Sequence, residues 1–164
     1  MYTLGGLMTV DSGRQSKADL CTVELLKTYH EIKRESVPDA LKSKLGNIIN
    51  KHYIVLSFKV TSDTKKEHLV YVKMNPDFNN NWSENEVEVY CDCADFKFRS
   101  AYILNQNNSL FATNRTKISL GSAITERPKT KTATSLLCKH AYAVIKWLLI
   151  NYKNVMKFIW AKYF

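Results

Sequence analysis

The chain has 164 residues, 45% of them apolar, which is enough to bury one compact core. No stretch is long and apolar enough to span a membrane, so a membrane protein is not expected. The net charge of +9 is unevenly distributed: residues 1–95 carry 12 Lys and Arg against 14 Asp and Glu, whereas residues 96–164 carry 12 against one. We therefore expect a single domain, residues 1–164, whose C-terminal half is strongly basic.

The first part of the chain is expected to be helical. Residues 1–14 are expected to form a loose N-terminal arm. Over residues 16–34 apolar side chains recur at helical spacing, which predicts a helix. Pro38 is expected to open a second, short helix, because proline suits the first helical position. Cys21 falls in the first of these helices, where the expected role is that of a small buried hydrophobe.

Strands follow the two helices. Residues 52–62 and 67–74 are rich in β-branched and aromatic side chains, as expected of a hairpin, and residues 86–93 supply a third strand. A short helix is predicted over residues 95–105 and a long C-terminal helix over residues 136–163. The predicted fold class is α+β: a small antiparallel β-meander packed with helices and closed by the long helix.

Three of the four cysteines and one of the four histidines occur in two tight pairs. Cys91 and Cys93 end the third predicted strand, and Cys138 and His140 lie at the start of the C-terminal helix. A structural Zn²⁺ site is closed by four tetrahedral sulfur or nitrogen ligands, and three thiolates with one imidazole fill that shell. The sequence therefore predicts one structural zinc ion that clamps the third strand to the C-terminal helix.

This zinc site places two demands on the backbone. Residues two apart on a flat strand are separated by roughly 6.6 Å, whereas two sulfurs on one zinc ion lie within roughly 4 Å. The strand is therefore expected to bend near Asp92, with backbone N–H groups turned toward the sulfurs. At the other pair, Thr134 and Ser135 are expected to cap the helix, whose dipole favours the Cys138 thiolate.

Three alternatives to zinc remain open. Free cysteine is among the most buried residue types, so the thiols also fit ordinary core packing. A disulfide framework is the second alternative, although we expect no signal peptide, and the few cysteines favour a reducing compartment. The third is a nucleophilic Cys91 activated by His140, which requires a site without zinc.

Cys-x-Cys, a variable insert, and Cys-x-His entering an apolar helix resemble the SWIM-type zinc finger, a ββα zinc module, over about residues 86–150. That family occurs in bacterial ATPases, plant transposases and ubiquitin-pathway proteins, so the resemblance implies a DNA-binding or protein-binding module. The insert, residues 94–137, is longer than the usual SWIM spacer. The stretches CDCADFKFRSAY and LLCKHAYAVIKWL are also similar to small SWIM-like proteins of tailed bacteriophages, which implies a free-standing module of this size.

Residues 105–134 are predicted to form a basic loop within this insert, opposed only by Glu126. Lys and Arg side chains in such a loop bind nucleic-acid phosphates without reading bases. The alternative is a solvated loop that keeps the protein soluble. The predicted nucleic-acid-binding residues are Arg115, Lys117, Arg127, Lys129 and Lys131.

The C-terminal helix is predicted to have three faces. Its core face consists of Ala141, Ile145, Leu148, Tyr152, Val155 and Ile159. Its basic stripe consists of Lys139, Lys146, Lys153 and Lys157. Trp147, Ile150 and Phe158 point away from the core face and are predicted to bind a partner. The alternative for these aromatic side chains is packing under the insert or the N-terminal arm.

The sequence contains no motif of an enzyme: no glycine-rich phosphate loop, no serine elbow and no carboxylate pair placed for acid and base work. We therefore expect a non-enzymatic zinc-binding structural or assembly protein of the bacteriophage virion-associated kind, located in the virion or the host cytoplasm. Its expected partners are other structural proteins and, through the basic half, DNA, with no small-molecule substrate. The alternative is a soluble SWIM-type DNA-binding accessory factor in recombination or transposition.

Overall fold

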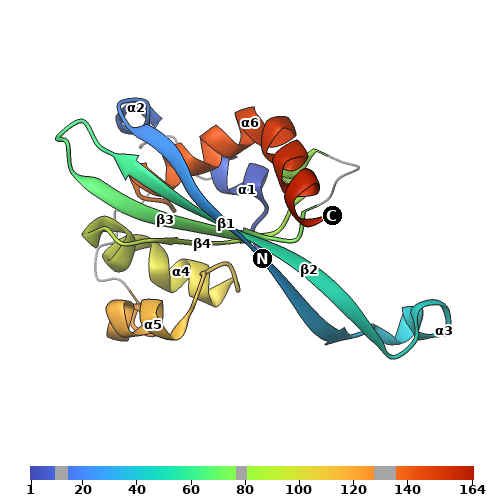
Figure 1. Cartoon of the computed structure of the whole chain (residues 1–164). Coiled ribbons are helices and arrows are strands. Elements are labelled where there is room, and N and C mark those ends of the chain that lie inside the picture. The colour runs from blue at the N-terminus through green and yellow to red at the C-terminus, as the bar shows by residue number, and fades with distance from the viewer. Residues whose placement is uncertain (10–14, 77–80, 128–135) are drawn as a thin grey trace.

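The computed structural model describes residues 1–9, 15–76, 81–127 and 136–164 (Figure 1). Its centre is an antiparallel sheet with the strand order β1-β2-β3-β4. The strands are β1 (Thr22–Ser36), β2 (Ile48–Thr61), β3 (Glu67–Met74) and β4 (Val87–Cys91). The predicted α+β class is confirmed: α1 (Leu4–Thr9) and α6 (Lys139–Tyr163) cover one face, and α4 (Ala101–Gln106) and α5 (Asn114–Leu120) lie on the other.

The predicted hairpin and third strand are confirmed as β2, β3 and β4. Alternating residues of these strands face α6, and Leu56, Val72 and Val89 lie opposite one another across the three strands. All three are fully buried. Their β-branched and aliphatic side chains fit a pleated surface that is covered on one side, which explains the period-two pattern of these segments.

The helix predicted over residues 16–34 is wrong. The chain forms the short α2 (Gln15–Ala18) and then β1, which pairs with β2 from Thr22↔Thr61 to Ser36↔Ile48. The register shifts between Leu25 and Lys27. Such a bulge breaks the alternation of side chains, so the apolar residues on either side of it acquire a spacing that imitates a helix.

The N-terminal arm is not loose over residues 1–9. Leu4 and Leu7 are fully buried, and α1 contacts α6. Backbone hydrogen bonds fix the segment at both sides: the Leu4 N–H donates to the Asn85 carbonyl at 2.9 Å, and the Val87 N–H donates to the Tyr2 carbonyl at 3.0 Å. The other residues of the predicted N-terminal segment, 10–14, lie outside the described residues.

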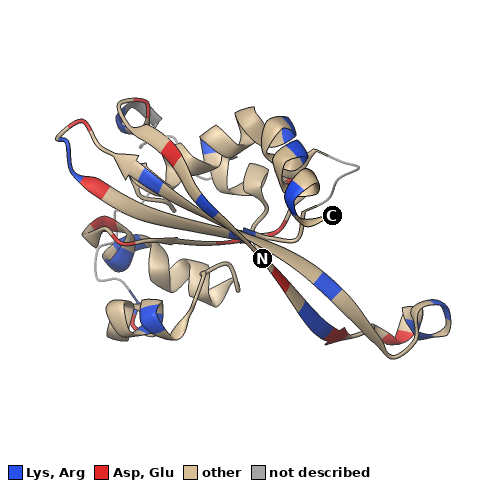
Figure 2. Cartoon of the chain, viewed as in Figure 1, with Lys and Arg blue, Asp and Glu red and all other residues tan. Residues whose placement is uncertain are grey.

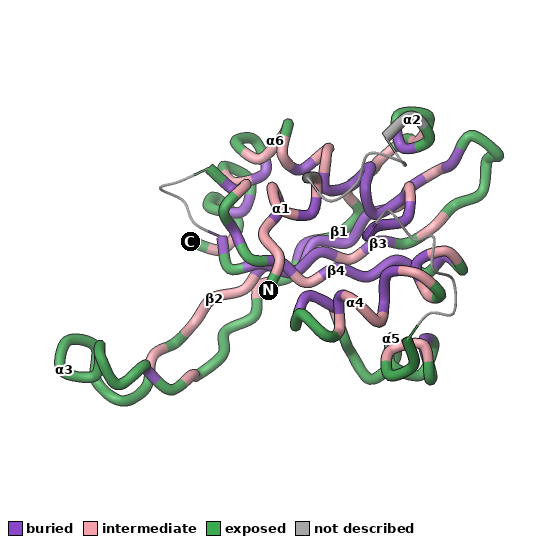
Figure 3. Tube along the Cα trace, turned by 180° about the vertical axis from the view of Figure 1, so that it is seen from behind, coloured by how far each residue is buried: buried purple, intermediate pink, exposed green. Residues whose placement is uncertain are grey.

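The hairpin of β1 and β2 extends well beyond the body of the molecule (Figures 1 and 3). The β3 pairing of β2 ends at Ile54↔Met74, so residues 32–52, which we call the arm, pair only within the hairpin. The arm ends in a 3₁₀ helix, η1 (Asp39–Leu41), and α3 (Lys42–Leu45). The short helix expected at Pro38 is therefore present, with Pro38 as its N-cap.

The helices after the sheet agree with the predictions in type and differ at their ends. A π-helical turn, η3 (Phe96–Ser100), continues into α4, as expected for residues 95–105. The α6 helix begins at Lys139 and not at residue 136, because Cys138 is its N-cap. Its predicted core face is buried except for Tyr152, which is half-buried. Within the described ranges, no helix is long and apolar enough to cross a membrane.

The burial of α1 leads to a stability prediction. Leu7→Ala is expected to lower the free energy of unfolding by about 2–5 kcal/mol, because it leaves a cavity in a fully buried site. Leu20→Ala, at a position 61% exposed, is the matched control and should change that free energy by less than about 0.5 kcal/mol. Urea unfolding measures both variants. Equal effects of the two substitutions would show that α1 does not contribute to the core.

Candidate metal centre

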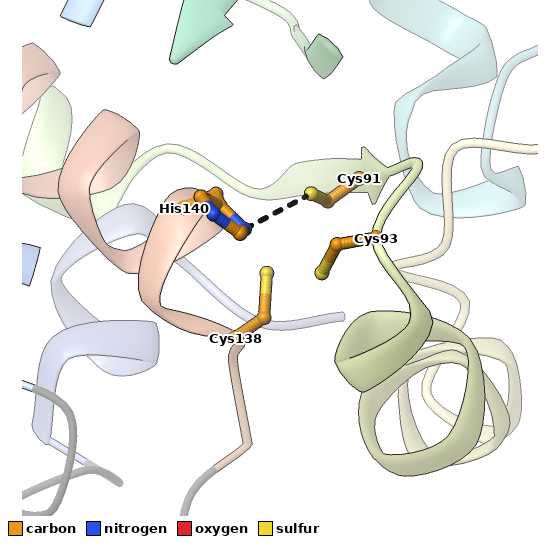
Figure 4. Close-up of side chains that lie close together, drawn as sticks. All are labelled: Cys91, Cys93, Cys138 and His140. Atoms are coloured by element: carbon orange, nitrogen blue, oxygen red, sulfur yellow. Dashed lines mark hydrogen bonds between the residues drawn. The ribbon is translucent and has the colours of Figure 1, made fainter. Parts of the chain in front are cut away.

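The structure brings the four predicted ligands together at the junction of the sheet and α6 (Figure 4). Cys91 ends β4, Cys93 follows it at a bend, Cys138 caps α6, and His140 lies in the first turn of that helix. All four side chains are buried, and their ligand atoms lie within 4.8 Å of one another. The arrangement could hold a metal ion.

The local backbone explains why the two cysteines of the first pair converge. After Cys91 the Asp92 N–H still donates to the Leu69 carbonyl at 3.2 Å, and the chain then bends at Cys93. The Phe96 N–H donates to the Cys93 Sγ at 3.3 Å. The predicted bend near Asp92, with an N–H group turned toward sulfur, is confirmed.

The start of α6 positions the second pair, Cys138 and His140. The Ala141 N–H donates to the Cys138 Sγ at 3.4 Å, so the sulfur itself caps α6. Thr134 and Ser135, the expected caps, lie outside the described residues. A helix N-terminus favours negative charge, which suits a Cys138 thiolate bound to a cation.

The size of the cluster can be compared with that of a tetrahedral zinc site. With bonds of about 2.3 Å to sulfur and 2.0–2.1 Å to nitrogen, neighbouring ligand atoms of such an ion are separated by roughly 3.5–3.8 Å. The Cys91 Sγ lies 4.0 Å from the His140 Nδ1. All four ligand atoms lie within 4.8 Å of one another, so the cluster is wider than a closed S₃N shell and would contract around an ion.

Electrostatics explains why these thiols are unusual as core residues. Burial raises the pKa of the Cys91 and Cys138 thiols well above the ordinary value. Hydrogen bonds from Cys138 and Cys91 lower the pKa of the Cys93 thiol. A divalent cation favours three thiolates, because its charge offsets theirs in a buried site.

The His140 ring adds an independent sign that the cluster is not ordinary packing. Its Nδ1 faces the Cys91 sulfur, and its buried Nε2 has no hydrogen-bond partner among the described residues. A buried polar atom without a partner costs about 1–3 kcal/mol. Within the described residues, the hydrogen-bond contact of the ring is directed at the sulfurs, so the histidine is placed as a ligand would be. The disulfide alternative has no support either, because all four cysteines are free.

One residue beside the cluster, His68, was not found from the sequence. The His68 ring packs on the His140 ring with centroids 4.2 Å apart, and the His68 Nδ1 lies 2.9 Å from the Asp92 Oδ1. The pairing of β3 with β4 explains the position of His68. Val70 pairs with Cys91, and His68 lies two residues before Val70 on the same strand, which places it beside the bend at Cys93.

The predicted nucleic-acid-binding residues occupy more ordered structure than expected. Arg115 and Lys117 are exposed on α5, which is followed by a 3₁₀ helix, η4 (Gly121–Ile124), so residues 114–124 are not a loop. Thr113 and Thr116 form a capping box that starts α5. Arg127 is exposed, and Lys129 and Lys131 lie outside the described residues.

The basic stripe of α6 is divided into two parts (Figure 2). Lys139 pairs with Asp63 at 3.3 Å, and Lys146 pairs with Asp19 at 2.7 Å. Further along, Lys153 and Lys157 are exposed, and neither has an ion-pair partner in the described part of the chain. Only the second half of the stripe therefore presents uncompensated positive charge.

The three predicted partner-binding residues differ in exposure. Trp147 is half-buried and packs edge-on against Phe58 of β2, with ring centroids 5.5 Å apart. Ile150 is 71% exposed and Phe158 49% exposed. For Trp147 the observed contact agrees with a packing role, although its partner is the sheet and not the insert or the N-terminal segment.

No protein-family model matches the chain, and searches of curated proteins and of solved structures return no match. The metal centre therefore rests on the geometry, burial and chemistry of its four side chains.

We predict that binding of a metal ion to this cluster stabilises the folded protein. Cys93→Ser is expected to abolish binding of one divalent cation per chain and to lower the free energy of unfolding by at least about 3 kcal/mol, because metal-binding energy contributes to folding. Removal of metal by a chelator should have a similar effect on the unmodified chain. Native mass spectrometry measures the metal, and urea unfolding measures stability.

Cys21→Ser is the control, because Cys21 lies outside the cluster and its thiol donates to the Lys17 carbonyl at 3.6 Å. This variant should retain the metal. Normal melting of metal-free Cys93→Ser would show that the four side chains are ordinary core residues.

Proposed function

We propose that Cys91, Cys93, Cys138 and His140 hold a structural zinc ion and that the protein is a non-enzymatic assembly module. Soft thiolate ligands with one imidazole favour zinc, and four protein ligands leave no open position for water or substrate. When bound, the ion would supply a fixed cross-link between the end of β4 and the start of α6. Burial of all four side chains supports a structural role over chemistry by Cys91.

We further propose that this centre is of the SWIM type. The first pair follows a strand and the second pair begins a helix, which is the order that a ββα zinc module requires. The resemblance to small phage proteins supports a role in the virion, in contact with other structural proteins.

The arm is the observation that carries the assembly role. Its two strands pair only with each other, and a two-stranded hairpin is marginally stable by itself in water. Four large apolar side chains of the arm are about half exposed: Ile32, Leu41, Leu45 and Ile48. Burial of such side chains against a partner would stabilise the arm, which explains why the chain retains them. Exposed Ile150 and Phe158 offer a second apolar contact.

The second candidate is a DNA-binding accessory factor. It is favoured by exposed basic side chains without ion-pair partners in the described ranges: Arg115, Lys117, Arg127, Lys153 and Lys157. Phosphate contacts of this kind make affinity strongly dependent on salt. A contact through the apolar side chains of the arm would be much less sensitive to salt.

The assembly role is tested on the chain recovered from its natural source. Native mass spectrometry is expected to find one zinc ion and a larger protein assembly. The double variant Leu45→Glu and Ile48→Glu should be found as a zinc-containing monomer, because two buried carboxylates would oppose the contact. Ile118→Glu, at a position 83% exposed on α5, is the matched control and should remain in the assembly. Assembly of the double variant would rule out the arm as the contact.

Salt distinguishes the two candidates. We expect the protein to bind duplex DNA weakly. The double variant Lys129→Ala and Lys131→Ala should not change this affinity. The matched control is the double variant Lys65→Ala and Lys66→Ala, which removes two exposed lysines outside the basic half and should have the same affinity. Titrations between about 50 and 200 mM salt measure this. A selective loss of affinity in the first variant, with a steep salt dependence of the unmodified chain, would favour the DNA-binding factor.

A further inference from the structure

A cavity of about 520 Å³ lies on the face of the sheet that α6 does not cover, between the strands and α5. Its volume falls within the range of small-ligand sites. Four aromatic rings line it: Tyr29 of β1, Tyr71 of β3, Tyr90 of β4 and Phe111. The metal centre does not use this cavity, and the core of the protein lies mainly on the other face of the sheet.

The rings differ in how accessible they are. Tyr90 is buried and packs edge-on against Phe96, so it forms a wall. Tyr71 and Phe111 are half-buried and stack on each other, with centroids 5.5 Å apart and an interplanar angle of 23°. Tyr29 is 51% exposed, and no hydrogen bond holds its hydroxyl among the described residues. Tyr29 and the Tyr71–Phe111 pair thus offer aromatic surface to a ligand.

Two carboxylates, Glu31 and Asp92, and one guanidinium, Arg115, line the cavity, and both carboxylates already have partners. Glu31 pairs with Lys73 at 3.1 Å, and Asp92 contacts His68 at 2.9 Å. Arg115 is exposed and has neither an ion pair nor a hydrogen bond to any residue that the structure describes. A guanidinium group binds phosphate oxygens in a bidentate manner. The cavity therefore combines aromatic stacking surface with one phosphate-binding group.

We propose that this cavity binds a nucleotide unit of single-stranded nucleic acid, with the base against Tyr29 and the Tyr71–Phe111 pair and a phosphate on Arg115. Every base has a π face, so aromatic side chains bind single strands with little sequence preference. Bases inside a duplex are stacked on each other and cannot reach the rings. Residues 96–164 carry 12 Lys and Arg against one Glu, and this positive charge attracts a strand with many phosphates more strongly than a single nucleotide.

This proposal does not rest on the assembly role, since the arm does not contribute the stacking rings or Arg115. It also differs from backbone binding of duplex DNA, because it requires unpaired bases. Failure of either idea would leave the other intact.

Fluorescence anisotropy of the full metal-bound chain with a labelled oligo(dT) strand tests the site. Tyr29→Ala should weaken binding by about fivefold to a hundredfold through loss of stacking, whereas Tyr29→Phe should retain affinity. Arg115→Gln should reduce the slope of log affinity against log salt by about 0.7, the value for one phosphate contact on a single strand. The slope should not change in Tyr29→Ala.

Trp160→Ala and Lys66→Gln are the matched controls, because Trp160 lies on α6, across the sheet from the cavity, and Lys66 lies in the connection between β2 and β3 outside the cavity lining. Neither should change affinity or salt slope. Unchanged binding in both Tyr29→Ala and Arg115→Gln overturns the proposal. Duplex binding as tight as strand binding overturns it as well. Equal affinity for dTMP and for the strand would identify a free-nucleotide site and would also refute the strand proposal.

Discussion

The convergence of three sulfurs and one imidazole between β4 and α6 is the constraint on which the rest of the fold depends. Elsewhere the interface between the sheet and α6 consists of aliphatic side chains that attract one another without direction. At the cluster a bound metal ion would make the contact directional, because each ligand atom would have to point at one centre. The bend after β4 and the start of α6 therefore have little freedom, and the long intervening chain is closed into a loop between them.

The ligands of this centre could be predicted because their information is local. Each pair is read from three consecutive residues, and the helix after His140 is long and strongly amphipathic. His68 could not be found in this way. Its place beside His140 depends on the register of β3 against β4, which no short sequence motif specifies. The aromatic cavity was missed for the same reason, since its rings come from three strands and a later segment.

The two errors in the N-terminal part have one physical cause. A bulge in β1 and a short helix at Leu4–Thr9 both have weak local signals, and both are stabilised by segments distant in sequence. β1 is held by β2, and Leu4 and Leu7 are buried by contacts that form only when α6 is in place. By contrast, no bulge interrupts the pairing of β2 with β3 or of β3 with β4, so the alternation of their side chains was sufficient.

The arm has a consequence for the dynamics of the molecule. Because its hydrogen bonds involve only two strands, it can open without disturbing the sheet beneath α6. Amide hydrogens at its tip should exchange with solvent far faster than those of β2 under α6, and proteases should cleave there first. A partner that holds the arm in place must offset the entropy of ordering it. Attachment through the arm, as proposed above, would therefore be reversible, and the fold that carries the arm would stay intact.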